Sequence, residues 1–159
     1  MKINCLWRTR KHPKPDLALL EKAANAAAEL AGLDMSFEWI LELQFVGDRN
    51  MAAANAQFVG HQGTTDVITF SYFDSSEPVF PGDTGIELII CTDVAAREGA
   101  ARDNSSYAAE LMLYLVHGLL HAAGEDDLTE TAAKSMRRRE TEVIAGLTPE
   151  FDFSKIFPE

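Results

Sequence analysis

The sequence predicts one α+β or α/β domain over residues 1–159, in which helices surround a small mixed sheet. A chain of 159 residues is long enough to bury one sizeable core. Its composition, 47% hydrophobic and 25% charged, is that of a globular protein and excludes a disordered chain or a disulfide scaffold. Short β-branched and aromatic segments alternate with longer amphipathic segments, in the order β-α-β-α-β-β-α-α-α.

The first three predicted elements are a strand, a helix and a second strand. Residues 1–7 form a short strand. Asp16 can cap a helix that continues to about residue 31, where Gly32 ends it. Residues 37–46 place large apolar side chains at alternate positions, which predicts a strand with one buried face.

The middle of the chain predicts a short helix and two further strands. Asp48 is expected to cap a helix over residues 51–58. Residues 65–72 are β-branched and aromatic, which favours a strand. Residues 74–85 contain prolines and glycines without periodicity and predict a loop. The dense apolar run 86–91 is typical of a central strand.

Three helices complete the predicted fold. Asp93 is expected to cap a helix that ends near residue 102. Residues 107–123 form the longest apolar helix, a core element that Gly124 ends. Thr129 opens the last helix, which continues to about residue 145. Residues 146–159 include two prolines and predict a loose tail.

Charge is distributed unevenly along the chain. The net charge of −11 argues against a general nucleic-acid binder. The first 14 residues are the exception, because they contain five basic residues and no acidic one. This basic arm either contacts phosphate or pairs with the acidic body. The candidates for contact with RNA are Arg8, Arg10 and Lys11.

The cysteines and the N-terminus indicate a cytoplasmic protein. Cys5 and Cys91 lie in apolar runs and are predicted to be reduced core residues. No apolar run approaches the roughly 20 residues that span a bilayer. The N-terminus has no apolar leader, so we expect neither export nor association with a membrane.

The segment from His117 to Asp127 carries the clearest chemical signal. His117 and His121 are four residues apart on the predicted helix, so their imidazoles can converge on one metal ion. Gly124 allows the chain to reverse, and the three acidic residues after it can return a carboxylate to that ion. We favour this interpretation over two histidines satisfied by ordinary hydrogen bonds, because these features occur together. Gly118 replaces the general-base glutamate of zincin proteases, which argues against that peptidase route.

The same segment resembles the signature of the YbeY endoribonucleases, also described as rRNA maturation factors. That signature is His-x3-His-x2-Gly-x-Asp-His, and this chain has Asp127 at the last position. Further matches in order and spacing are Asn55, Gly60, Thr65, Asp66, Val67 and Phe70 upstream, and Met136, Glu140 and Ile144 downstream. The resemblance extends over nearly the whole chain.

The resemblance implies an α+β fold with a mixed four-stranded sheet and the histidine helix packed beneath it. It implies a single-strand-specific, zinc-dependent endoribonuclease that acts in 16S ribosomal RNA 3′-end maturation and ribosome quality control. The expected partners are single-stranded or ribosomal RNA and the ribosomal small subunit. The expected ligands of one Zn²⁺ per chain are His117, His121 and Asp127, and the metal-bound water is the nucleophile or the electrostatic catalyst.

Two positions depart from the family pattern. Asp127 is a competent zinc ligand, but a carboxylate in place of an imidazole favours competition by Mn²⁺ or Fe²⁺. Val59 stands where the family has an arginine that is expected to hold RNA phosphate. Asp126 is expected either to partner a ligating histidine or to cap the turn, and no side chain is an evident general base. The arginines at 137–139 are interpreted as a solvated helix face.

Two alternative functions stay open from the sequence. The same fold with a structural metal could serve as a non-catalytic module that binds ribosomal RNA or a ribosomal partner. The missing arginine and the net charge of −11 favour that alternative. The second alternative is a small metallohydrolase with a substrate other than RNA, because the body of the chain is acidic.

Overall fold

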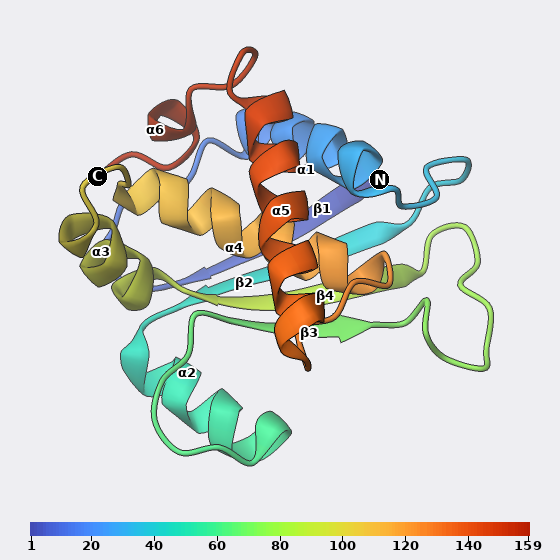
Figure 1. Cartoon of the computed structure of the whole chain (residues 1–159), viewed down its shortest axis with the longest axis horizontal. Helices are drawn as coiled ribbons and strands as arrows, with labels where there is room; N and C mark the ends of the chain where they lie inside the picture. Colours follow the sequence, from blue (N-terminus) through green and yellow to red (C-terminus); the bar gives the residue numbers. More distant parts are fainter.

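The computed structural model describes residues 1–159, and its centre is a mixed four-stranded sheet with the strand order β1-β2-β4-β3. Strands β1 (Lys2–Arg8), β2 (Ile40–Val46) and β4 (Thr84–Cys91) are parallel. Strand β3 (Val67–Ser71) pairs antiparallel with β4 at one edge of the sheet (Figure 1). The predicted α+β fold with a mixed four-stranded sheet is confirmed.

Alternation along the strands gives the sheet two different faces. In β2, Leu41, Leu43 and Phe45 are fully buried in the main core, whereas Glu42 and Gln44 between them are partly exposed. This period of two places every second side chain on the same face of the sheet. The apolar face therefore requires a layer of helices to cover it.

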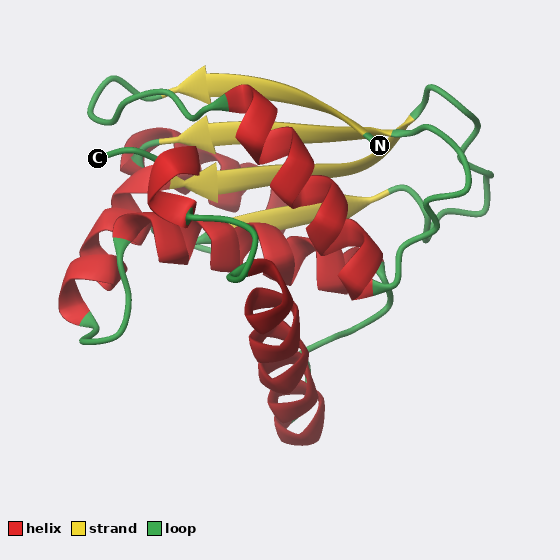
Figure 2. Ribbon diagram, turned by 90° about the horizontal axis from the view of Figure 1, so that it is seen from above, coloured by secondary structure: helices red, strands yellow, loops and turns green.

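The long helices supply that cover. α4 (Tyr107–Ala122) lies against β3 and β4, and it also contacts α1 (Leu17–Ala31), α3 (Thr92–Ala101) and α5 (Glu130–Leu147). Figure 1 shows α5 crossing in front of α4, and Figure 2 shows the strands as one layer beside the helices. α4 is thus enclosed by the sheet on one side and by helices on the others, as expected for the central apolar helix.

A smaller core lies on the other face of the sheet. The predicted helix over residues 51–58 is a short helix, α2 (Asp48–Ala54), that continues as a π-helical segment, η1 (Asn55–Val59). Met51 of α2 packs with Ile68 and Ile89 of the sheet. This arrangement holds η1 next to the edge strand β3.

Two aspartates do not cap helices as the sequence predicted. α2 begins at Asp48 itself after Gly47, and α3 begins at Thr92, so Asp93 lies inside its first turn. Asp48 instead pairs with Arg97, at 2.6 Å between Oδ2 and Nη1. The buried Asp93 accepts the backbone amide of Asp48 at 2.9 Å. Both carboxylates therefore join the start of α2 to α3, which spacing within one segment could not reveal.

The predicted loose tail is instead folded. α5 ends at Leu147, and a short helix, α6 (Phe153–Ile156), follows it. Ile156 and Phe157 are both only 1% exposed, and the rings of Phe157 and Phe45 lie 5.7 Å apart. The prediction was wrong because the prolines and the glycine in this stretch obscured two apolar residues that belong to the core.

Other predictions concern the strand limits, the cysteines and the membrane. β2 begins at Ile40 rather than at residue 37, because Trp39 is buried with its Nε1–H donated to the Asp34 carbonyl at 2.9 Å.

Both cysteines are free thiols, but only Cys91 is fully buried, and partial burial still raises the pKa of Cys5 to about 11. None of the helices has the length and apolar character needed to cross a bilayer.

Candidate functional site

The close approach of α4 to the sheet fixes the position of both histidines. Gly118 faces the sheet, where a Cβ atom would lie 2.5 Å from Leu88 Cδ2 and 3.2 Å from Thr69 Oγ1. Any larger side chain at this position would push α4 away from β3 and β4. Glycine therefore allows His117 and His121 to lie beside the edge of the sheet, and a glutamate of the zincin type would not fit there.

A turn after α4 returns Asp127 to the histidines. Gly124 has a φ of 105°, a left-handed conformation that glycine adopts without a steric penalty. The backbone amide of Glu125 then donates to the Leu120 carbonyl at 3.0 Å. As a result, Asp127 Oδ2 lies 3.8 Å from the Nε2 atom of each histidine.

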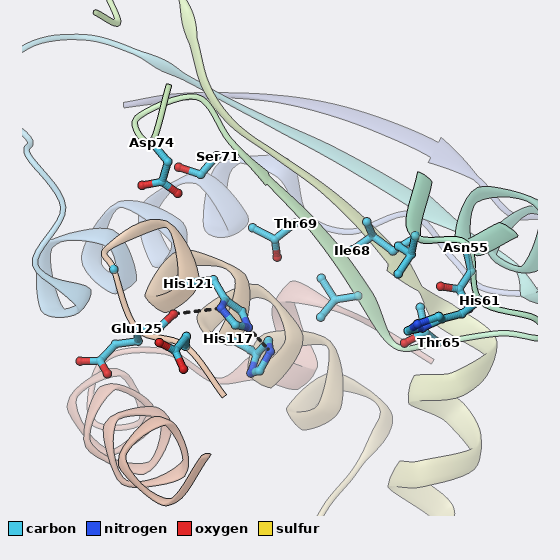
Figure 3. A pocket seen from close by; sticks show the side chains of 14 residues that line it. Asn55, His61, Thr65, Ile68, Thr69, Ser71, Asp74, His117, His121 and Glu125 are labelled. Atoms are coloured by element: carbon cyan, nitrogen blue, oxygen red, sulfur yellow. Dashed lines mark hydrogen bonds between the residues drawn. The ribbon is translucent and has the colours of Figure 1, made fainter. Parts of the chain in front are cut away.

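The two imidazoles face each other through their Nε2 atoms, which are 2.9 Å apart (Figure 3). Each Nδ1 atom has a different partner. His117 Nδ1 lies 2.5 Å from Glu140 Oε1, and His121 Nδ1 donates to the Glu125 carbonyl at 2.9 Å. A carbonyl can only accept, so in a neutral His121 ring the lone pair is on Nε2. These outer contacts direct both Nε2 atoms toward Asp127.

The electrostatic environment of His117 favours positive charge. Burial lowers the pKa of this imidazole, but the hydrogen bond to Glu140 and the charges of Glu140, Asp66 and Asp127 outweigh burial and raise it above 6.5. Carboxylates thus surround a half-buried position that one imidazolium or one metal cation can occupy. The site accordingly suits a cation.

The donor set fits a first-row metal ion. The only group of three potential ligand atoms that converge in the chain comprises His117, His121 and Asp127, all within 4.8 Å of one another. A tetrahedral zinc ion with bonds of about 2.0–2.1 Å would separate its donor atoms by about 3.3 Å. The observed separations of 2.9, 3.8 and 3.8 Å therefore require shifts of only about half an ångström.

An open pocket of about 600 Å³ lies beside this cluster, between α4, β3 and η1. Figure 3 shows Asn55 and His61 on the wall opposite His121, with Thr69 of β3 between the two walls. Val59 also lines the pocket and is 44% exposed. None of the lining residues is a lysine or an arginine. The pocket is thus polar and accessible but lacks a fixed positive charge.

Asp126 caps the turn and contacts neither histidine. Its Oδ1 atom accepts the amide of Leu128 at 3.2 Å, so of the two predicted roles the structure supports the turn cap. The outer partner of His117 is instead Glu140 of α5. Sequence reasoning placed Glu140 on the last helix but gave it no role, because the crossing of α5 over α4 cannot be read from spacing.

The predicted RNA-contacting residues line a different part of the surface. Arg8, Arg10 and Lys11 surround a separate hollow of about 420 Å³ at the carboxyl ends of β1 and β2, together with Arg49 of α2. Lys11 pairs with the buried Asp93 at 3.5 Å, whereas the three arginines of this hollow make no ion pair. Within the basic arm, Lys11 therefore pairs with the body, which is one of the two predicted behaviours, and contact of the arm with phosphate stays a prediction.

Fold and site together define a small α+β protein with a candidate three-ligand metal centre beside an open polar pocket. A family model described as Endoribonuclease YbeY matches residues 5–148, and the chain belongs to this family. An Endoribonuclease YbeY of an Anaeromyxobacter species is 35% identical over 133 residues, which cover 84% of this chain and 67% of the relative. The Methylococcus capsulatus Endoribonuclease YbeY is 32% identical over 151 residues, covering 91% and 99% of the two chains.

A solved structure supports the same fold. The solution structure of TM1509 from Thermotoga maritima superposes with a TM-score of 0.60 over 93% of this chain and 90% of that chain. The two sequences are only 21% identical, so the similarity concerns the fold.

Proposed function

We propose that the protein is a metal-dependent endoribonuclease that cleaves single-stranded RNA, with a role in 16S ribosomal RNA 3′-end maturation. The observation that carries this proposal is the convergence of two Nε2 atoms and one carboxylate beside an open pocket. Family membership supports the nuclease class, since the relatives are named endoribonucleases. The same role would place the protein in the cytoplasm, at the ribosomal small subunit.

His117, His121 and Asp127 would hold one zinc ion, which would act as a Lewis acid toward a phosphoryl oxygen and acidify water. Glu140 keeps the His117 ring oriented and balances its charge. The Glu125 carbonyl fixes the ring of His121 in the same way. The Asp127 carboxylate brings a negative charge and a hard oxygen donor, so Mn²⁺ or Fe²⁺ would compete better than at three imidazoles.

The surroundings of the site suit an extended, flexible substrate. The pocket is open, and the hydroxyl groups of Thr65 and Thr69 line it and can hydrogen-bond to ribose and base edges. The hollow of the basic arm adds further cations at the opposite end of α2 and η1. We propose that Arg8, Arg10 and Lys11 contact phosphates of a longer RNA there.

The first test combines metal analysis with RNA cleavage. The untagged protein is purified natively, and its metal content is measured beside that of Asp127→Ala and Asp74→Ala. Each variant then receives a single-stranded RNA oligonucleotide and the corresponding duplex. We expect about one transition metal per chain, lost in Asp127→Ala and kept in Asp74→Ala, which removes the same charge from the pocket wall without changing the turn after α4. Cleavage of the single strand should follow the metal content.

A non-catalytic module is the second candidate, because the pocket beside the histidines contains no lysine or arginine. This candidate predicts a bound metal and RNA binding without cleavage. If the wild-type protein binds metal but leaves the RNA intact at stoichiometric enzyme, the nuclease proposal fails. If the wild-type protein takes up no metal even from added zinc, both candidates fail.

A further inference from the structure

The pocket beside the histidines lacks a group that could hold a phosphate. Its charged lining residues other than the histidines are the acids Asp74, Glu125 and Asp126. RNA carries a negative charge at every phosphate, and proteins bind it mainly through lysine and arginine. A cation that serves the reacting phosphate must therefore come from another side of the site.

A second pocket, of about 540 Å³, lies on the other side of His117 and contains two arginines, Arg102 and Arg137. Arg102 is already engaged by carboxylates. It contacts Glu98 Oε2 at 3.1 Å and Glu110 Oε1 at 3.3 Å, and Glu110 is only 2% exposed. Arg102 therefore neutralises a buried acid and has no net charge to offer a ligand.

The other carboxylates of the second pocket also have partners of their own. Glu140 contacts His117, and Asp127 faces both histidines. Asp66 accepts the amide of Val67 at 2.7 Å. None of these acids forms an ion pair with Arg137, which makes no salt bridge anywhere in the chain. Arg137 is thus the one uncommitted cation in the two pockets that adjoin the metal ligands.

The three consecutive arginines of α5 differ in their surroundings. Arg138 and Arg139 both pair with Glu142, at 4.0 and 2.7 Å, and neither lines the second pocket. Arg137 lies three residues before Glu140, so the two share a face of the helix, and Glu140 contacts His117 directly. Arg137 and Arg138 are exposed, in agreement with the interpretation of the triplet as a solvated face, whereas Arg139 is partly buried and donates to the Leu30 carbonyl at 3.0 Å. Of the three, only Arg137 also lines the second pocket.

We infer that Arg137 binds the RNA phosphate next to the candidate metal centre. Arg137 lines the second pocket from α5, whereas Val59 lines the pocket beside the histidines. A guanidinium can donate two parallel hydrogen bonds to one phosphate, which suits this task better than an ammonium. The inference deepens the proposed function and rests on RNA as the ligand.

The test measures binding separately from cleavage. A fluorescent single-stranded RNA with 2′-O-methyl groups, which block cleavage through the 2′-hydroxyl, is titrated with zinc-loaded protein at several salt concentrations by fluorescence anisotropy. A denaturing gel after each titration checks that metal-activated water has not cleaved this RNA. The proteins are the wild type, Arg137→Ala, Arg137→Lys and Arg138→Ala. Arg138→Ala is the matched control, because it removes the same charge from the next position of the helix. Circular dichroism checks that each variant is folded.

The logarithm of the RNA-binding constant falls linearly with the logarithm of the salt concentration. We expect Arg137→Ala to make this slope shallower by about 0.7, the value for one phosphate contact with a single strand. If both proteins bind equally at 1 M salt, this difference in slope makes Arg137→Ala bind RNA about eight-fold more weakly than the wild type at 50 mM salt. Arg138→Ala should bind as the wild type does, and Arg137→Lys should recover part of the loss. An unchanged slope in Arg137→Ala, or an equal loss in both alanine variants, would overturn the inference.

The two proposals fail in different ways. If the wild type binds the RNA with dependence on Arg137 but cleaves no unmodified RNA, the nuclease proposal fails and the phosphate contact stands. If the wild type cleaves RNA and the kcat/KM of Arg137→Ala equals that of Arg138→Ala, the nuclease proposal stands and the role of Arg137 is refuted.

Discussion

Replacing Glu140 by glutamine tests whether α5 controls the candidate metal centre from outside the ligand set. Glu140 Oε1 lies 2.5 Å from His117 Nδ1, and the glutamate side chain is only 14% exposed. Glutamine keeps the shape and one acceptor oxygen but removes the charge. Loss of such an outer partner costs about 10- to 100-fold in metal affinity, or about 1.4–2.7 kcal/mol. We expect a value near the upper end, because a short, shielded, charged contact is lost.

The assay is a competition for zinc between the protein and a chromophoric chelator. Glu142→Gln is the control on the same helix, because Glu142 is exposed and pairs only with Arg138 and Arg139. Such surface pairs contribute little, so the control should bind zinc within about two-fold of the wild type. If Glu140→Gln binds zinc as tightly as the wild type, the outer contact does not support the ligand. If both variants lose zinc affinity equally, the loss comes from the reduced negative charge of α5 and not from the contact with His117.

Three further predictions concern the ligand set and the fold. Asp127→His restores the third imidazole of the family signature and should raise the preference for Zn²⁺ over Mn²⁺ in competitive metal binding, because it removes the hard oxygen donor. Phe157→Ala should cost about 3–5 kcal/mol in urea unfolding, since the ring is 1% exposed against Phe45. Asp48→Asn should lose no more than about 1 kcal/mol of stability at pH 6. The hydrogen bond from Arg97 lowers the pKa of Asp48 below its ordinary value of 3.8. The extra stability of the wild type over Asp48→Asn is therefore complete above pH 3.8 and should disappear as the pH falls through the lowered pKa. A stability difference that does not change with pH would contradict this reasoning.

Local signals in the sequence predict most of the fold. The strands and the long helices follow from periodicity, because each buries one face against a neighbour. The three candidate ligands lie in one short segment, in which His117 and His121 are one helical turn apart and Gly124 reverses the chain. Their convergence could therefore be predicted from the sequence without knowledge of the tertiary packing. The metal itself stays a prediction that the geometry supports.

The missed features depend on contacts between distant segments. Glu140 reaches His117 only because α5 crosses α4, and Arg137 shares that crossing. Asp93 resembles a helix cap in sequence but is buried against the start of α2, 45 residues away along the chain. α6 is held by Ile156, whose carbonyl accepts the Asp16 amide at 2.9 Å. No residue spacing within a single element encodes these distances.

The order of synthesis separates the candidate ligands from Glu140, the residue that orients His117. His117, His121 and Asp127 lie within one short segment, whereas Glu140 follows Asp127 by 13 residues and belongs to α5. Translation proceeds at about 5–20 residues per second, so Asp127 is made about 0.7–2.6 seconds before Glu140. Until α5 docks on α4, no carboxylate holds the ring of His117 in place. Tight metal capture at His117 therefore requires α5 to have docked on α4.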